Sequence, residues 1–125
     1  MSFEWGLIKP LVATENTESP AMSLMHVVLL PGEGHERHNH PGSDEILYIL
    51  SGRGEQMVDD ADTFPVRAGQ AVFIPKGAFH STVNVAWEPL ALLAIYAPAG
   101  AEEVLKTLPD HREIAPGEAP RLVRS

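Results

Sequence analysis

The sequence predicts an all-β sandwich or barrel, and two observations carry that prediction. Short apolar stretches of β-type composition recur along the chain, and ten glycines and eleven prolines among the 125 residues separate them. Six of these stretches are expected to be strands, namely residues 23–30, 45–50, 55–58, 71–74, 81–85 and 90–96. Strands this short and this closely spaced are typical of a sandwich or barrel.

The segments between the expected strands have the chemistry of turns. Gly relaxes the backbone, and Asp or Pro biases the bend, in residues 31–34, 51–54, 59–62, 75–77 and 88–89. Only residues 101–108 show a helical pattern, with Gly100 before them and Pro109 as the stop. Their apolar side chains fall on one side, so we expect a short C-terminal helix packed outside the barrel.

Length and composition fit one globular domain covering residues 1–125. A chain of this size buries one sizeable core, and 44% apolar residues with 21% charged residues are ordinary for a folded domain. The N-terminal arm, residues 1–20, and the C-terminal tail, residues 109–125, have mixed polarity and several prolines, so we expect them to need a neighbour to be ordered. Because the chain has no cysteine, nitrogen and oxygen atoms must hold any metal.

Charge and hydropathy exclude two classes of partner. Seventeen acids against nine bases give a net charge of −8, which offers no basic footprint to nucleic acid. No apolar run is long enough to span a membrane, so we expect no membrane partner. The first residues lack the basic and apolar regions of a signal peptide, and we therefore expect a cytoplasmic protein.

Three histidines and one glutamate form the candidate metal site. In an extended strand, residues i and i+2 point to the same face, so His38 and His40 can turn both imidazoles onto one ion. Glu45 opens the next strand after a turn, and His80 follows another turn, so both can return to that ion. An isolated His-x-His pair is more often hydrogen-bonded than metal-bound, and the prediction therefore depends on all four residues. His35 and His111 have no comparable partners and are expected on the surface.

The spacing of these residues resembles the two motifs of the cupin superfamily. The first motif runs from Gly32 through His38, His40 and Glu45 to Gly52, and the second from Gly69 through the Pro75-Lys76-Gly77 turn and His80 to Asn84. Ten fixed positions coincide by chance on the order of 10⁻¹³ of the time per placement at ordinary residue usage. The resemblance covers motif one, residues 32–52, and motif two, residues 69–84, and identifies a small single-domain cupin.

This resemblance implies a cupin β-barrel, a jelly roll also called a double-stranded β-helix, with one divalent transition metal ion per chain. The implied ligands are His38, His40, Glu45 and His80. Nitrogen and oxygen ligands suit Fe, Mn, Ni, Co or Zn, and the sequence does not choose among them.

The expected substrate pocket surrounds this site. Strand alternation from Glu45 sends Leu47 and Ile49 inward and Tyr48 outward. Other candidates lie in or near the two motifs, and simple core packing is the alternative for each apolar one. The full candidate set is His26, Leu47, Ile49, Gln56, Met57, Phe73, Phe79 and Tyr96, with Met25, Arg37 and Arg53 as further neighbours.

Three functions fit these residues. The first is a metal-dependent enzyme that acts on a small oxygenated metabolite by redox-neutral Lewis-acid chemistry, as an isomerase, cyclase or lyase. The second is an Fe(II)-dependent dioxygenase, and the third is a non-catalytic small-molecule-binding or sensor protein. The sequence assigns no general acid or base.

The N-terminal segment also suggests a homodimer. Residues 3–8 alternate apolar and polar like a half-buried strand, yet they precede the first convincing barrel strand by some fifteen residues. Such a segment can pair with an edge of its own sheet or of a neighbour's sheet. We expect a homodimer with this segment in the contact, and the alternative is that Phe3 and Trp5 cover the base of their own barrel.

Overall fold

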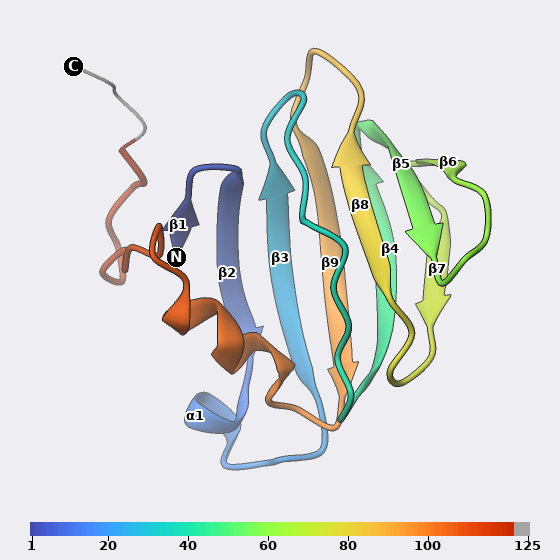
Figure 1. Ribbon diagram of the computed structural model, residues 1–125. Coiled ribbons are helices and arrows are strands. Elements are labelled where there is room, and N and C mark those ends of the chain that lie inside the picture. The colour runs from blue at the N-terminus through green and yellow to red at the C-terminus, as the bar shows by residue number, and fades with distance from the viewer. Residues whose placement is uncertain (122–125) are drawn as a thin grey trace.

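The computed structural model describes residues 1–121 and contains two antiparallel sheets (Figure 1). The strands of the larger sheet are, in spatial order, β1 (Ser2–Phe3), β2 (Gly6–Val12), β3 (Ser23–Leu29), β9 (Leu90–Ala97), β4 (Asp44–Ser51) and β7 (Ala71–Ile74). The smaller sheet contains β6 (Phe64–Arg67), β5 (Arg53–Val58) and β8 (His80–Asn84). The all-β prediction is therefore confirmed.

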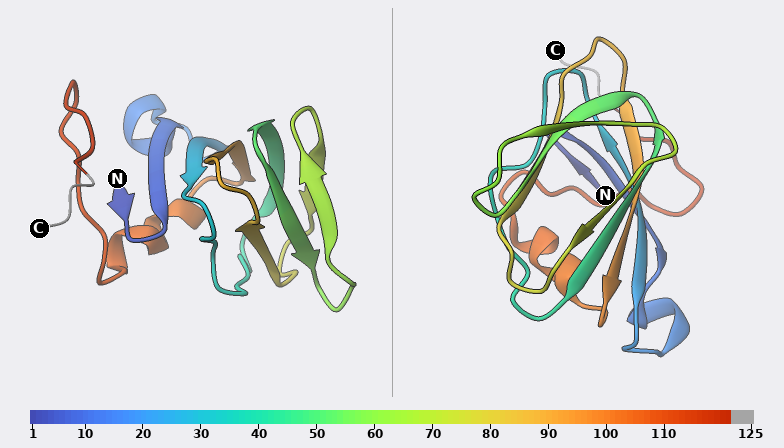
Figure 2. Two further views of the ribbon diagram at one scale, coloured as in Figure 1. Left: turned by 90° about the horizontal axis from the view of Figure 1, so that it is seen from above. Right: turned by 90° about the vertical axis from the view of Figure 1, so that its right-hand side faces the viewer.

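The two helical elements are short. A single turn, α1 (Thr14–Thr17), follows β2, and a 3₁₀ helix, η1 (Ala101–Thr107), replaces the helix expected near the C-terminus. Figure 2 shows the smaller sheet at one end of the molecule, and the two chain termini at the other end. Among residues 1–121, no helix combines the length and apolar character that crossing a membrane requires.

Side-chain alternation on the central strands creates the core. On β3, Met25, Val27 and Leu29 are buried while the residues between them are partly exposed. On β4, Leu47 and Ile49 are buried, and Tyr48 is 41% exposed, as alternation from Glu45 predicts. The inner face of the larger sheet is thus the wall against which the site is built.

The connection between β4 and β5 depends on a glycine. Gly52 has a φ of +83°, and a Cβ there would lie 2.6 Å from the carbonyl oxygen of Pro89. Only glycine accepts both this backbone conformation and this close approach without strain. The last glycine of the first motif therefore fixes how the two sheets join.

The N-terminal arm pairs with strands of its own chain. β2 pairs with β3 of its own chain, in a register that places Lys9 opposite His26, and β1 folds back on β2. Phe3 is only 4% exposed, and Ser2 forms a bridge with Arg112 in the C-terminal tail. Residues 1–20 were expected to need a neighbour to be ordered, and for β1 and β2 the free edge of β3 in the same chain is such a neighbour. Residues 122–125 of the tail lie outside the described residues.

One strand was not expected. β6 contains Pro65, which donates no hydrogen bond and argues against a central strand. In the structure β6 lies at the edge of the smaller sheet and pairs only with β5, with Pro65 opposite Glu55. An edge position tolerates the proline.

Candidate metal centre

The three histidines of the predicted site meet because two segments are hydrogen-bonded together. The His38 amide donates to the His80 carbonyl at 3.0 Å, and the His80 amide donates back to the His38 carbonyl at 2.8 Å. The Gly77 amide donates to the His40 carbonyl at 3.1 Å. The ligand atoms of His38, His40 and His80 consequently lie within 4.8 Å of one another.

Glu45, the second residue of β4, lies beside these histidines. Its side chain is 4% exposed, and its Oε1 lies 3.0 Å from His80 Nε2 and 3.6 Å from His40 Nε2. The structure thus places Glu45 against His40 and His80, while the group whose ligand atoms all lie within 4.8 Å of one another contains His38, His40 and His80.

Backbone carbonyls set the tautomers of two imidazoles. His38 Nδ1 lies 2.7 Å from the Glu36 carbonyl oxygen, and His80 Nδ1 lies 3.0 Å from the Ala78 carbonyl oxygen. A carbonyl oxygen only accepts, so both Nδ1 atoms carry the proton and donate it. In the neutral rings Nε2 then presents a lone pair, which is the arrangement seen in histidine ligands.

The remaining polar atoms of this group call for a cation. His40 Nε2, His80 Nε2 and Glu45 Oε1 are buried and have no hydrogen-bond partner of suitable geometry among residues 1–121. Lone pairs that face one another in a buried site are costly unless a positive charge lies between them. A proton on one imidazole can be shared with only one of these acceptor atoms, whereas a metal ion between them accepts lone pairs from all three. The donor set therefore fits a divalent transition ion held by nitrogen and oxygen.

The histidines differ in protonation. Burial lowers the pKa of His40 to about 4, against the opposing charge of Glu45. Burial also lowers the pKa of His38, although the Glu36 carbonyl works the other way. For His80 burial is outweighed by the Glu45 carboxylate and the Ala78 carbonyl, so its pKa is raised. Near neutral pH, His38 and His40 are therefore in the form that binds metal.

A cavity of about 1620 Å³ surrounds the four residues. Its wall against the larger sheet is apolar and includes Met25, Leu47, Leu92 and Ala94. Tyr96, 8% exposed, packs edge-on against the His40 ring at 5.1 Å between ring centres. Burial and the nearby Glu45 charge raise the pKa of Tyr96 well above its usual value, so its hydroxyl is a proton donor and not a base.

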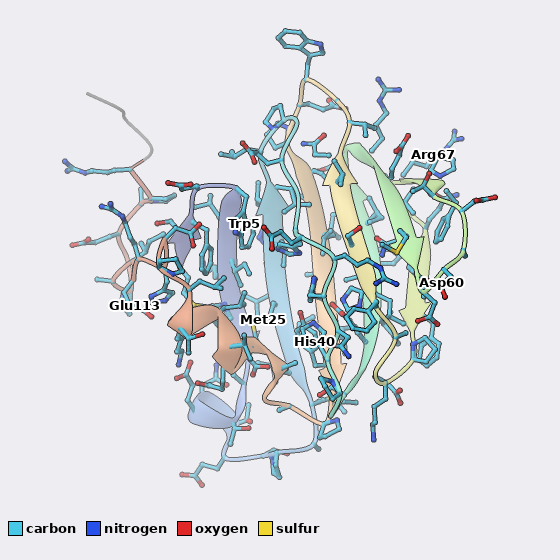
Figure 3. All side chains as sticks on the ribbon, viewed as in Figure 1. Trp5, Met25, His40, Asp60, Arg67 and Glu113 are labelled. Carbon is cyan, nitrogen blue, oxygen red and sulfur yellow. The ribbon has the colours of Figure 1, made fainter. Side chains whose placement is uncertain are left out.

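Trp5 and His35 are among the cavity residues that the sequence did not predict. The Trp5 ring stacks on the Phe3 ring with 4.6 Å between ring centres, and it contacts the His35 ring edge-on with 4.3 Å between ring centres. The centres of the His35 and His38 rings are 5.4 Å apart. Figure 3 shows Trp5, Met25 and His40 on the side of the larger sheet that carries η1. His35 was expected on the surface but is partly buried, because Trp5 packs against its ring. For Trp5, the alternation of apolar and polar residues in 3–8 was the sequence feature that could have predicted a side chain facing the cavity.

A buried acid from η1 also approaches the site. Glu102 is 5% exposed, and its Oε2 accepts hydrogen bonds from Ser23 Oγ at 2.9 Å and from the Gly100 amide at 3.1 Å. Ser23 is the cross-strand partner of Tyr96. The sequence pattern gives no sign that Glu102 is buried, and a surface charge was the natural expectation.

The eight pocket candidates divide into three groups. Leu47 and Tyr96 line the cavity. Ile49 and Gln56 are fully buried in the core, where Gln56 accepts a hydrogen bond from Thr82, and they do not line it. The other four lie outside the cavity: His26, Met57, Phe73 and Phe79.

Strand parity explains the four misplaced candidates. His26 lies between the inward-facing Met25 and Val27, and Met57 follows the inward-facing Gln56. Phe73, between two buried residues of β7, is 60% exposed. Phe79 precedes buried His80, is 41% exposed, and carries the Arg37 guanidinium 4.7 Å from its ring centre. His111 is partly buried beside Phe3, with Nε2 3.0 Å from Glu113, and is not a surface residue as expected.

Known proteins share this fold and these motifs. The family model described as "Cupin domain" matches residues 25–96. Polyketide synthase CurC of Streptomyces cyaneus is 39% identical over 72 residues, which are 57% of this chain and 46% of CurC. The oxalate-binding protein of Thermotoga maritima is 33% identical over 85 residues, covering 68% of this chain and 69% of that protein. The chain thus spans about half of CurC and a larger share of the oxalate-binding protein.

Among solved structures, the S161A mutant of oxalate decarboxylase OxdC from Bacillus subtilis superposes with a TM-score of 0.72 at 27% identity. The match covers 87% of this chain and 31% of OxdC. The double-stranded β-helix expected from the motifs is therefore the fold observed.

Proposed function

This chain belongs to the cupin family, and we propose that it is a metal-dependent enzyme acting on a small oxygenated metabolite by redox-neutral chemistry of the isomerase, cyclase or lyase type. The observation that carries the proposal is the group of buried acceptor atoms on His40, His80 and Glu45, which have no hydrogen-bond partner in residues 1–121 and open onto the cavity. A built but unsatisfied polar group in a cavity indicates a working site more than a stabilising one.

The ligand residues of the proposal are His38, His40, Glu45 and His80. When bound, a divalent Fe, Mn, Ni, Co or Zn ion on these side chains would supply a Lewis acid for a substrate oxygen. Three neutral imidazoles and one carboxylate leave one net positive charge on such a site, which favours an anionic or electron-rich oxygen.

The surrounding side chains are suited to orient such a substrate. Because its pKa is raised, the Tyr96 hydroxyl near Glu45 keeps its proton throughout the ordinary pH range and is available as a hydrogen-bond donor to a substrate. The apolar wall of Met25, Leu47, Leu92 and Ala94 excludes water from one side. Low polarity around the few donors strengthens their interaction with a developing negative charge.

The relatives favour redox-neutral chemistry over oxygen chemistry. CurC is named as a polyketide synthase and OxdC as an oxalate decarboxylase, and neither name describes an oxygenase. A second function, non-catalytic binding of a small acid, is favoured by the oxalate-binding protein of Thermotoga maritima, which this chain matches over 69% of its length.

Metal analysis tests the site. The purified chain is expected to hold about one divalent ion, because the buried Glu45 carboxylate needs a compensating charge. His38→Ala and His80→Ala should lower the metal content sharply, while His26→Ala, which removes a histidine from the outer face of β3, should leave it unchanged. Full occupancy in both cavity variants would reject the site.

An activity screen then separates the functions. The chain is loaded with each metal in turn and offered small hydroxy acids, keto acids and sugar derivatives, with and without oxygen. Equal turnover under both atmospheres supports the proposal. Oxygen uptake coupled to turnover would identify a dioxygenase instead, and tight binding without turnover would identify a binding protein.

A further inference from the structure

The C-terminal segment covers a part of the larger sheet that the smaller sheet does not cover. Figure 1 shows β8, β5 and β6 on the side of β4 and β7, and η1 on the side of β2. Ala101, Leu105 and Leu108 of this segment pack against the core and also line the cavity. We call residues 98–112, which carry these three side chains, the strap.

Hydrogen bonds attach the strap near both of its ends. It begins directly after β9, and Ser43 Oγ, two residues before the predicted ligand Glu45, donates to the Pro98 carbonyl at 2.8 Å. The strap ends at Arg112, whose amide donates to the Ser2 carbonyl at 3.0 Å and whose carbonyl accepts from the Ser2 amide at 2.8 Å. The strap therefore runs from the edge of the candidate metal centre to β1.

One buried contact holds the middle of the strap on the sheet. Glu102 is 5% exposed, and its Oε2 accepts hydrogen bonds from Ser23 Oγ at 2.9 Å and from the Gly100 amide at 3.1 Å. Ser23, fully buried at the start of β3, lies opposite Tyr96, which lies opposite Glu45. The contact therefore joins the strap to the cross-strand row that carries a predicted metal ligand.

The other attachments of η1 are weak. All seven of its residues are in 3₁₀ geometry, and runs of this length are uncommon because their hydrogen bonds are poorly aligned. Lys106 pairs with Glu15 and Glu103 at 3.5 Å, and exposed pairs of this kind contribute little. No side chain of the described chain caps the N-terminus of η1, and Glu102 is the only buried residue of the helix. Segments with few buried contacts open most easily, so the contact of Glu102 decides how firmly the strap is held.

The candidate metal centre is closed in this structure. His40 Nε2, His80 Nε2 and Glu45 Oε1 are buried, and Met25 is only 1% exposed although it lines the cavity. A substrate reaches these atoms only when a covering segment moves. Residues 33–40 and the strap are the segments outside the two sheets that line the cavity around this site.

Of these two covering segments, residues 33–40 are fixed. Gly34 forms a bridge with Val83 of β8, and His38 forms a bridge with His80. Moving this segment would break the backbone hydrogen bonds that bring the ligand residues together. The strap is therefore the segment that can move without dismantling the site.

We propose that the strap opens and closes over the candidate metal centre, and that the hydrogen bond between Glu102 and Ser23 is the latch that holds it closed. A closed strap excludes water from the ligand residues, and an open strap admits a substrate and releases a product. What the strap admits rests on the proposed function, whereas its opening does not. Two separate measurements therefore test the proposal.

Proteolysis of the metal-free protein measures the opening. Trypsin cleaves after Lys106 of η1 when the strap opens, while it cleaves after Arg53 of β5 on global unfolding. Glu102→Ala and Ser23→Ala should each raise the ratio of the first cleavage rate to the second at least about tenfold, the effect of losing one hydrogen bond to a charged group. Glu102→Gln, whose amide oxygen still accepts from Ser23, should keep the wild-type ratio, and so should Val104→Ala, which shortens a 61% exposed side chain of η1. Wild-type ratios in both Glu102→Ala and Ser23→Ala would overturn the latch.

A reversible crosslink tests whether this opening gives access to the metal centre. Ser2 and Arg112 exchange both backbone hydrogen bonds, and such antiparallel pairs have Cα atoms about 5.5 Å apart, within the range of a disulfide. Because the chain has no cysteine, Ser2→Cys with Arg112→Cys can form only this crosslink within the chain. The oxidised, Co²⁺-loaded variant should lose its metal to a chelator at least about tenfold more slowly than the same variant reduced with a phosphine, because the crosslink holds the end of the strap on β1. The control Arg53→Cys with Arg67→Cys, which links β5 to β6, should lose metal at the same rate in both states.

The outcomes separate the strap from the proposed function. Equal rates of metal loss in the oxidised and reduced Ser2→Cys, Arg112→Cys variant would overturn the strap as the gate. A wild type that binds no Co²⁺ would reject the proposed function, and the ratio of cleavage after Lys106, which needs no metal, would still decide whether Glu102 holds the strap closed.

Discussion

Replacement of His35 by phenylalanine should change the acid stability of the metal-free chain. His35 lies between Trp5 and His38, at 4.3 and 5.4 Å between ring centres, and its Nε2 has no hydrogen-bond partner in the described chain. Burial, followed by the neighbouring histidines, lowers the pKa of His35 to about 3. Phenylalanine keeps the ring between Trp5 and His38 but removes the titration.

The direction of the change in stability depends on whether the folded or the unfolded chain binds the proton more tightly. Between pH 6.5 and about 3 the unfolded chain protonates this imidazole while the folded chain does not. Acid therefore favours the unfolded state, and the stability that His35 permits near neutral pH is lost progressively below pH 6.5. Each pH unit in this window corresponds to about 1.36 kcal/mol. At about pH 5 the loss is about 2 kcal/mol, and at about pH 7.5 it is about 0.1 kcal/mol.

Urea unfolding in the presence of a chelator measures this difference. Wild type and His35→Phe are compared at several pH values between about 7.5 and 5, so that each protein's value at the highest pH serves as its own reference. The wild type should lose about 2 kcal/mol more than the variant over this range. His38 and His40 destabilise both proteins in acid and cancel in the comparison. Equal losses in the two proteins would refute the burial of a neutral imidazole at position 35.

Three further predictions follow from single contacts. Titration of Ni²⁺ or Co²⁺ should quench the fluorescence of Trp5, because its ring lies against His35, which neighbours His38. A Trp87→Phe variant, which removes the 99% exposed second tryptophan, should retain this quenching, and loss of the quenching in the variant would contradict the site. Gly52→Ala should lower the free energy of unfolding, measured by heat or urea, by more than about 2 kcal/mol, because it combines a positive φ with a clash against Pro89. The control Gly42→Ala, whose added Cβ meets nothing within 4 Å, should change it by less than about 0.5 kcal/mol, and equal effects of the two variants would reject the close approach at Gly52. Glu102→Ala should lower the free energy of unfolding in urea by about 1 to 3 kcal/mol, because it leaves the buried Ser23 hydroxyl without its hydrogen-bond acceptor. Glu103→Ala, on the exposed side of η1, should be nearly neutral, and a larger loss in Glu103→Ala than in Glu102→Ala would exclude a structural role for Glu102.

The candidate ligands could be predicted from the sequence because each is placed by residues close to it in the chain. His38 and His40 are two residues apart in an extended segment, Glu45 begins β4, and His80 begins β8 after a glycine turn. Each of these positions is set by short-range chemistry that a motif records. Their convergence needed only the hydrogen-bonded bridge between His38 and His80, which turns two local patterns into one site.

The cavity wall was less predictable because it depends on which face of each strand turns inward. Alternation from Glu45 correctly predicted that Leu47 and Ile49 turn inward, since one buried residue fixes the parity of its own strand, but only Leu47 lines the cavity. The sequence offers no such anchor for β7, and the size of Phe73 favoured the wrong face. Register supplies the missing anchor, because Glu45 pairs with Ile74 and Ile46 pairs with Phe73.

The same register argument explains where the misplaced candidates lie. His26 and Phe73 were expected in the pocket because they are large and lie near the motifs, and both lie instead on the outer face of the larger sheet. Apolar residues occur on both faces of these strands, so hydrophobicity alone does not distinguish the wall of the cavity from the outer face. The parity of a strand is fixed only by a residue whose side is known, such as Glu45 on β4, and the register then carries this parity to the neighbouring strands β7 and β9.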